Sequence, residues 1–391
     1  MNNLSLFPNL RAPYLLKNKL SILPKNKPHN VGKLPQNKTS LVLHPNKDYR
    51  QISSQIQLKT KNYALYYGSY GIPKQRRPKK NQKVDEYLNS PVDIMKSPYD
   101  SGKLSYKVGE DAFFNRGDAL GLADGIGGWA NKENSDSSYF SRRLMHNAHY
   151  EISRYEDIED DLFTRYNQAT PVEIMREAYK NTLADMKAKE LKGSSTICLA
   201  LLRGEELRVA NLGDSGLTII RNGDMIFRTE EQQHSFNYPY QLGTEKLTDC
   251  VTDAQVFRIR VKKGDLIVLA SDGLYDNLFD EDILDIISDL LPKKMRPINR
   301  PSMIRYNGNI QDDDTSNNEG PQLPQSYVDP YMISKALASK AYEVSVDPEC
   351  TQSPFQSHAV HEGLYYHGGK SDDITIVSAI VTDLEDSPNR R

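Results

Sequence analysis

The sequence has few cysteines, no long apolar run and no strong excess of charge of either sign. Its three cysteines, Cys198, Cys250 and Cys350, lie far apart and include no C-x-x-C pair. This spacing argues against a zinc site and a disulfide framework, and it favours a reducing compartment. No apolar stretch approaches the ~18 residues that a membrane-spanning helix needs, so we expect no integral membrane segment. The net charge of -2 and the lack of a nucleic-acid-binding motif argue against nucleic acid as a partner.

Acidic residues are absent from the first 47 positions, and the first carboxylate is that of Asp48. An N-terminus that is basic and poor in acidic residues resembles an organelle-targeting leader, so we interpret residues 1–47 as such a leader. Lysine outnumbers arginine there, and four prolines would interrupt an amphipathic helix. These prolines are Pro8, Pro13, Pro24 and Pro28. The alternative is a disordered basic tail without a targeting function.

Composition divides the rest of the chain into a linker, one globular domain and a tail. Residues 48–96 are rich in Lys, Asn and Pro and lack hydrophobic periodicity, which predicts a disordered linker. We assign residues 97–383 to a single domain, because one core rarely grows beyond ~250–300 residues. Within this domain, residues 292–326 have little apolar content and predict a mobile surface insertion. Residues 384–391 form a polar tail.

Hydrophobic periodicity predicts helices on both sides of a run of strands. Thr170 and Pro171 are typical of a helix N-terminus, and Asn222-Gly223 between two strand patterns predicts a type I′ hairpin. The expected helices are 135–152, 171–189, one from about Asp280, and 330–346; the expected strands are 195–203, 205–213, 215–221, 224–229, 254–261, 265–271 and 374–382. This order favours a layered α+β fold with antiparallel sheets inside and helices outside.

Four predicted strand ends carry carboxylates. They are Asp124 in GLADGIGGW (121–129), Asp214 in NLGDSG (211–216), Asp272 in DLIVLASDG (265–273), and Asp372 with Asp373 in SDDIT (371–375). A single apolar run that ends in Asp-Gly is commonly a strand entering a turn. Carboxylates that gather at one place repel one another unless a cation neutralises them, and Mg²⁺ and Mn²⁺ prefer oxygen ligands. Gly125 has no Cβ, so its backbone oxygen could approach such an ion closely.

Six short motifs in this order resemble the metal-dependent type 2C serine/threonine protein phosphatases, the PPM family. They are GED (109–111), ADG-x-GG (123–128), GSST (193–196), NLGDSG (211–216), ASDGLYD (270–276) and SDDIT (371–375), and the resemblance spans residues 97–383. The segments DGIGGW and EEQQHSFNYPYQL (230–242) are similar to the mitochondrial branch of that family. The resemblance implies an αββα sandwich, with two Mn²⁺ or Mg²⁺ ions at one end between two antiparallel sheets and a weaker third ion.

The same resemblance implies roles for individual residues. Asp124 is expected to bridge two ions, and it is expected to act with Asp272 and Asp372 as the catalytic set. The implied metal-binding residues are Asp124, Gly125, Asp272, Asp372, Asp111, Glu110, Asp214 and Asp276, of which Asp214, Asp272 and Asp276 match the third position. Asp272 and Asp276 are four residues apart, so one turn of chain can present both.

The chain also departs from the family pattern. Ile126 stands where many members have the histidine proposed as general acid, although the mitochondrial branch shares an aliphatic residue there. The arginine that binds substrate phosphate in many members is missing before the acidic pair. Lys107 and, less directly, Arg116 are the candidates to replace it. Trp129 is expected to pack beside the metal loop rather than to contact substrate.

Together these features favour a monomeric phosphatase that acts on phosphoserine and phosphothreonine in mitochondrial proteins, in the matrix. A metal-activated water would attack phosphorus without a phosphoenzyme intermediate. Cytoplasmic residence is the alternative location. The competing function is a pseudophosphatase scaffold that binds partner proteins, which retention of all the carboxylates disfavours. A phosphodiesterase or nuclease would need a basic groove that the sequence does not predict.

Overall fold

The computed structural model describes residues 62–74, 105–290, 328–347 and 349–386. Its strands are β1 (Tyr63–Ile72), β2 (Tyr106–Val108), β3 (Asp111–Asn115), β4 (Ala119–Ala123), β5 (Ser194–Ser195), β6 (Ile197–Arg203), β7 (Glu206–Leu212), β8 (Gly216–Arg221), β9 (Asp224–Arg228), β10 (Gln233–Ser235), β11 (Tyr238–Pro239), β12 (Leu242–Gly243), β13 (Gln255–Arg260), β14 (Leu266–Ala270) and β15 (Ile374–Asp383). Its α-helices are α1 (Ser137–Arg154), α2 (Pro171–Ala188), α3 (Asp272–Tyr275), α4 (Asp280–Leu290), α5 (Pro330–Val346) and α6 (Pro354–His361).

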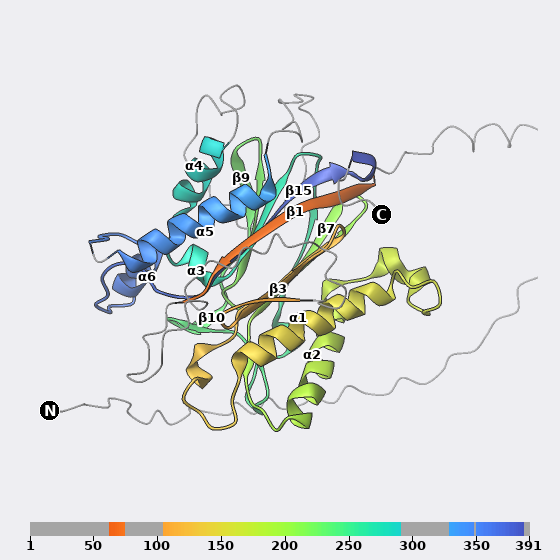
Figure 1. Ribbon diagram of the computed structural model, residues 1–391, viewed down its shortest axis with the longest axis horizontal. Helices are drawn as coiled ribbons and strands as arrows, with labels where there is room; N and C mark the ends of the chain where they lie inside the picture. Colours follow the sequence, from red (N-terminus) through yellow and green to blue (C-terminus); the bar gives the residue numbers. More distant parts are fainter. Residues whose placement is uncertain (1–61, 75–104, 291–327, 348, 387–391) are drawn as a thin grey trace, which may run out of the picture. The chain divides into compact units, whose positions relative to one another are not determined.

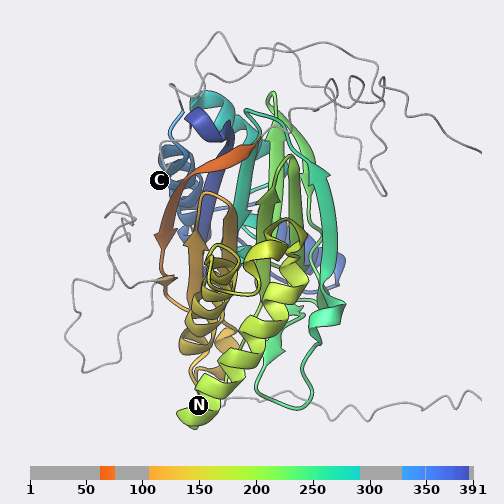
Figure 2. The same cartoon turned by 90° about the vertical axis from the view of Figure 1, so that its right-hand side faces the viewer.

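Two antiparallel sheets form the centre of the domain. The five-stranded sheet has the order β1-β15-β14-β8-β9, and the six-stranded sheet has the order β13-β7-β6-β4-β3-β2 (Figure 1). Helices α1 and α2 contact the six-stranded sheet, whereas α5 contacts β1 and β15 of the other sheet. Figure 2 shows the resulting four layers from the side. The predicted αββα sandwich is therefore confirmed.

Side-chain alternation along β6 explains how its sheet is buried on both faces. All seven residues of β6 are buried. Cys198, Ala200 and Leu202 belong to the core between the two sheets, whereas Ile197 and Leu199 belong to the core under the helices. Because successive side chains of a strand point to opposite faces, a strand between two cores has to be apolar at every position.

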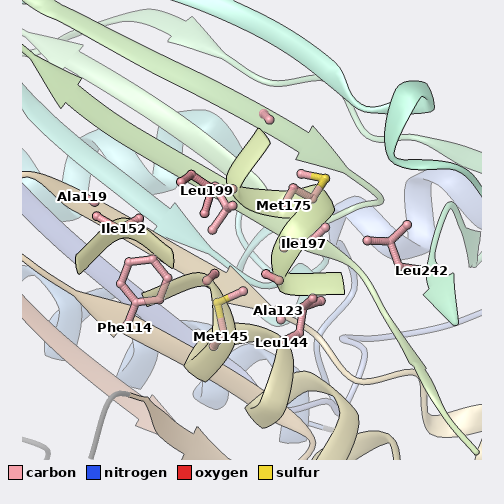
Figure 3. Close-up of a cluster of buried hydrophobic side chains, with 14 of the residues drawn as sticks. Phe114, Ala119, Ala123, Leu144, Met145, Ile152, Met175, Ile197, Leu199 and Leu242 are labelled. Atoms are coloured by element: carbon pink, nitrogen blue, oxygen red, sulfur yellow. The ribbon is translucent and has the colours of Figure 1, made fainter. Parts of the chain in front are cut away.

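The core under α1 and α2 holds these helices against the six-stranded sheet. Leu144 and Met145 of α1 and Met175 of α2 are fully buried with Phe114 of β3 and Leu199 of β6 (Figure 3). Truncation of such a side chain to alanine typically costs about 2–5 kcal/mol. This packing fixes the position of α1, whose first turn lies close to the loop that follows β4.

Two local predictions are confirmed. The side chain of Thr170 accepts a hydrogen bond from the Glu173 backbone N–H at 3.3 Å, and Pro171 opens α2. In the β8–β9 hairpin, Asn222 and Gly223 have φ values of 55° and 89°. Both values are positive, as a type I′ turn requires.

The predicted linker is wrong where β1 lies. This strand falls within residues 48–96, yet it pairs with β15 over ten residues, from Tyr63↔Asp383 to Ile72↔Ile374. Leu65 enters the core between the sheets, and Tyr70 enters the core under α5. Tyrosine favours strands, and four tyrosines in ten residues give β1 that character despite the weak aliphatic pattern. The domain therefore includes residues well before position 97.

Other predictions fall outside the described residues. These are the leader 1–47 and the insertion 292–326. At the other end, residues Leu384–Asp386 form a short 3-10 helix at the start of the predicted tail. Within the described part of the chain, no helix combines the length and apolarity needed to span a membrane.

Candidate functional site

Six aspartates gather at one end of the sandwich, and we call them the acidic cluster. They are Asp111, Asp124, Asp214, Asp272, Asp276 and Asp372. Antiparallel pairing explains the gathering, because it places the end of one strand beside the start of its neighbour. Ala112↔Ala123 joins the start of β3 to the end of β4, and Ala270↔Ile376 joins the end of β14 to the start of β15.

The cluster spans both sheets. Asp111 and Asp124 come from β3 and from the residue after β4, in the six-stranded sheet. Asp272 and Asp372 follow β14 and precede β15 in the five-stranded sheet, and Asp214 lies in the turn from β7 to β8, which connects the sheets. The site therefore forms only where the two sheets face each other.

The geometry of the cluster suits a hard divalent cation. One carboxylate oxygen each of Asp124, Asp214 and Asp272 lies within 4.8 Å of the other two. Both oxygens of Asp111, and Oδ1 of Asp214 and Asp272, are buried without a hydrogen-bond partner among the described residues. Buried polar atoms normally have partners, so these four oxygens are suited to hold a cation.

Electrostatics support the same conclusion. Burial raises the pKa of Asp111, Asp124 and Asp214 well above the ordinary value, and repulsion from neighbouring carboxylates raises it further. Asp272 is the exception. Burial is the largest influence and acts to raise its pKa, but the attraction of the Lys370 ammonium and hydrogen bonds with Lys370, Asp124 and Asp276 together hold that pKa below the ordinary value. Carboxylates with raised pKa values are the ones that a bound cation would return to the charged form.

Hydrogen bonds fix the Asp124 loop. The backbone oxygen of Asp124 accepts from the Thr196 N–H at 2.9 Å and from the Ser195 hydroxyl at 2.7 Å. The Asp124 N–H donates to Thr196 Oγ1 at 3.2 Å. A Cβ on Gly125 would lie 2.5 Å from the backbone oxygen of Glu110, so only glycine fits there without a shift. Ser195 and Thr196 thus orient Asp124.

Asp373 holds the turn that carries Glu110 and Asp111 in place. Its carboxylate accepts the Glu110 N–H and the Lys74 N–H, each at 2.7 Å. Gly109 has φ 59°, and a Cβ there would run into this carboxylate. Burial raises the pKa of Asp373 to about 6. Asp373 therefore joins β1 and the turn before β3 to β15, and its neighbour Asp372 belongs to the acidic cluster.

Asp111 is the first residue of β3, and Glu110 directly precedes it. Asp111 is fully buried in the acidic cluster. Glu110 is close to the loop after β4, since a Cβ on Gly127 would meet its Oε2 at 3.3 Å. The structure therefore brings both members of the early acidic pair to the same end of the sandwich as Asp124.

Two lysines near the cluster were not singled out from the sequence. Lys370 Nζ lies 2.5 Å from Asp272 Oδ2, 2.7 Å from Asp276 Oδ2 and 3.4 Å from Asp372 Oδ2. Lys74 Nζ lies 3.6 Å from Asp372 Oδ1, and its side chain is 45% exposed. The only feature of the sequence that could have identified Lys370 is its position, two residues before Asp372. Lys74 reaches the cluster through β1, which the sequence did not predict.

Lys107 and Arg116 lie away from the cluster, contrary to expectation. Lys107 pairs with Ala112, whose side chain faces α1, whereas Asp111 faces the other side of the sheet. Arg116 follows the far end of β3, about 16 Å along the strand from Asp111. It pairs there with Asp118 at 2.8 Å and with Glu156 at 2.6 Å. Strand direction and alternation thus place both side chains away from the cluster.

The aromatic residue beside the loop is packed, as predicted. Trp129 is 8% exposed, and its Nε1 donates to Ser194 Oγ at 2.6 Å. Lys132 covers the ring at 3.9 Å from the centroid. Ile126 precedes this turn, and its backbone N–H donates to the Ser194 oxygen at 3.1 Å. An aliphatic side chain at position 126 cannot donate a proton.

A family model and several relatives match the chain. The model for protein phosphatase 2C matches residues 107–303. Probable protein phosphatase 2C 80 of Arabidopsis thaliana is 34% identical over 276 residues, which cover 70% of this chain and 55% of that protein. The protein phosphatase PTC7 homolog of Xenopus laevis is 32% identical over 291 residues, which cover 71% of this chain and 83% of that protein.

A solved structure agrees with these matches. The X-ray structure of the photosystem II phosphatase PBCP has a TM-score of 0.55 at 28% identity, and the alignment covers 82% of this chain and 100% of that chain. The present chain spans about half the length of the Arabidopsis relatives, 55% and 48%.

Proposed function

The chain belongs to the protein phosphatase 2C family, and we propose that it hydrolyses phosphoserine and phosphothreonine in proteins with divalent metal ions held by its acidic cluster. The observation that carries this proposal is the convergence of Asp124, Asp214 and Asp272 within 4.8 Å, with unpartnered oxygens nearby. Clustered carboxylates with strongly shifted pKa values occur most often at catalytic sites, which favours an enzyme over a scaffold that only binds partners.

Asp124, the Gly125 backbone oxygen, Asp272 and Asp372 would hold two Mn²⁺ or Mg²⁺ ions, and Glu110 and Asp111 would lie around them. When bound, such ions make a water nucleophilic near neutral pH and offset the charge on phosphate oxygens. The chain's own contribution is to fix the carboxylates. Thr196 and Ser195 hold Asp124, while Asp373 holds the turn that carries Asp111.

We also propose that Lys74 contacts the substrate phosphate, in the role that the sequence suggested for Lys107 or Arg116. Its ammonium lies beside Asp372 and is partly exposed, so it can reach a phosphoryl group that approaches the cluster from solvent. Its backbone N–H is fixed by Asp373, which keeps the stem of the side chain at the site.

The decisive experiment is phosphate release from a phosphothreonine peptide by the full chain. We expect turnover with Mn²⁺, none with EDTA, and a loss of at least about 100-fold in Asp272→Asn, because a metal ligand becomes neutral. Asp383→Asn is the matched control, since Asp383 lies at the opposite end of β15 and pairs with Lys263. Binding of Mn²⁺ without any turnover would instead favour the pseudophosphatase.

For location, we propose the mitochondrial matrix, on the basis of the acidic-free first 47 residues and the branch that the motifs resemble. A fluorescent protein carrying residues 1–61 should enter mitochondria, and the full chain without residues 1–47 should stay in the cytoplasm. A cytoplasmic fusion would contradict this proposal. We expect the enzyme to be a monomer that acts on phosphoproteins, which light scattering would check.

A further inference from the structure

Lys370 places a positive charge inside the acidic cluster. Its side chain is 13% exposed, and its Nζ is within 2.7 Å of one oxygen each of Asp272 and Asp276. The third neighbour is Asp372 at 3.4 Å. Two of the three ammonium donors therefore form hydrogen bonds, to Asp272 and Asp276, and Asp372 adds an ion pair.

The fold holds this lysine from both ends. The Asn277 side chain accepts from the Lys370 N–H at 2.9 Å and donates to the Lys370 carbonyl at 2.9 Å. Asn277 directly follows Asp276, so the segment that carries one carboxylate partner also fixes the lysine backbone. At the other end, the ring of Phe355 on α6 lies 5.1 Å from Nζ. The ammonium is therefore positioned by its surroundings, unlike a lysine on an open surface.

The position of the ammonium coincides with residues that the family resemblance assigns to a weak third ion. That assignment rests on Asp214, Asp272 and Asp276, and Lys370 contacts the last two. We propose that Lys370 takes the place of the third ion, so that this chain binds two divalent ions and supplies the third cation itself. This inference relies on the proposed function only in that the acidic cluster binds divalent ions.

Crowding of positive charge supports the inference. Lys370 Nζ already lies between Asp272 Oδ2 and Asp276 Oδ2, at 2.5 Å and 2.7 Å. A divalent ion bound to the same two oxygens would lie beside the ammonium in a buried site, and repulsion between two neighbouring cations is unfavourable there.

A tethered cation changes what Asp276 does. Asp276 becomes the partner of Lys370 and not a metal ligand. The ammonium occupies the position of the third ion at every metal concentration. Loss of the ammonium should expose Asp214, Asp272 and Asp276 to solvent metal, which would create one extra, weaker site.

Counting bound Mn²⁺ by isothermal titration calorimetry on the metal-free full chain tests the proposal. We expect two equivalents for the wild type and for Asp276→Asn. Lys370→Gln should bind three, and the extra one should disappear in Lys370→Gln/Asp276→Asn. Lys340→Gln is the matched control, because Lys340 is an exposed lysine on α5 that pairs with Glu343; it should bind two.

Three equivalents in the wild type, with one lost in Asp276→Asn, would overturn the role of Lys370. Unchanged stoichiometry in folded Lys370→Gln would overturn it as well. If Lys370→Gln does not fold, Asp276→Asn in the wild-type background and Lys370→Arg, which keeps a cation and should bind two, still decide the question. A wild type that binds no Mn²⁺ at all would refute the proposed metal-dependent function itself, which is a different outcome.

Discussion

At the scale of the residue, the two lysines beside the acidic cluster differ in exposure and therefore in expected role. Lys370 is enclosed by carboxylates, whereas the side chain of Lys74 is 45% exposed and has Asp372 as its neighbour at 3.6 Å. A buried ammonium can balance charge permanently, but only an accessible one can meet an incoming phosphate.

Removal of the accessible ammonium should weaken substrate binding more than chemistry. For Lys74→Ala we expect KM for a phosphopeptide to rise about tenfold, as the loss of one charge-assisted contact predicts, with a smaller change in kcat. Lys74→Arg should retain most of the affinity. Lys107→Ala is the control, since Lys107 lies on the other face of its sheet. An unchanged KM in Lys74→Ala would exclude this lysine from substrate binding.

The sequence predicted those site residues that belong to a recognisable motif. The aspartates at strand ends could be identified because each follows or precedes an apolar run, and antiparallel pairing brings such ends together. Lys74 and Lys370 could not, since Lys74 meets Asp372, and Lys370 meets Asp272 and Asp276, across large separations in sequence. Lys107 and Arg116 were misassigned because motif proximity ignores which face and which end of a strand a residue occupies.

At the scale of the element, α1 contains a partly buried histidine that should make stability depend on pH. Burial and, less strongly, the nearby Arg116 lower the pKa of His149 to about 4, while Asp118 opposes the shift. The Nδ1 atom of His149 is buried without a hydrogen-bond partner among the described residues, and the ring contacts Phe114 edge-on at 5.5 Å. The folded protein therefore holds this imidazole in its neutral form.

The sign of the effect follows from proton uptake. An ordinary histidine titrates near pH 6.5, so below that pH the unfolded chain binds a proton that the folded chain refuses until about pH 4. Stability should fall as pH drops from about 6.5 to 4, and this contribution should be constant above that range. His149→Phe keeps the ring contact and should flatten the decline in urea unfolding measured across these pH values.

His361→Phe is the matched control, because His361 is exposed on α6. It should leave the pH dependence as in the wild type. An equally steep decline in His149→Phe would show that other groups carry the acid sensitivity.

Elements with strong local signals were predicted well. Helix α2 has its N-terminal cap and proline, and the β8–β9 hairpin has its Asn-Gly turn, so the chain specifies both locally. Strand β1 was missed, since its sequence YALYYGSYGI has two glycines and few aliphatic residues. Its stability comes from pairing with β15 and from burial, which a local pattern does not contain.

At the scale of the whole molecule, the layered fold could be predicted from the order of helices and strands. Each sheet buries one apolar face against helices and the other against the second sheet. The position of the site at the shared end of the sheets followed from the carboxylates. The start of the domain did not, since the strand that closes the five-stranded sheet precedes the first motif, GED (109–111), by more than thirty positions in the sequence.

The pairing of β1 with β15 also sets the order in which the molecule can be completed. Strand β1 is at the edge of its sheet, and β15 is its neighbour there. During synthesis β1 leaves the ribosome before the other described strands, and its partner β15 leaves after all of them. Asp372 and Asp373 immediately precede β15, so a nascent chain acquires this strand and these two carboxylates together. The five-stranded sheet can therefore be completed only by a contact between segments far apart in sequence, and such long-range closure makes folding slow.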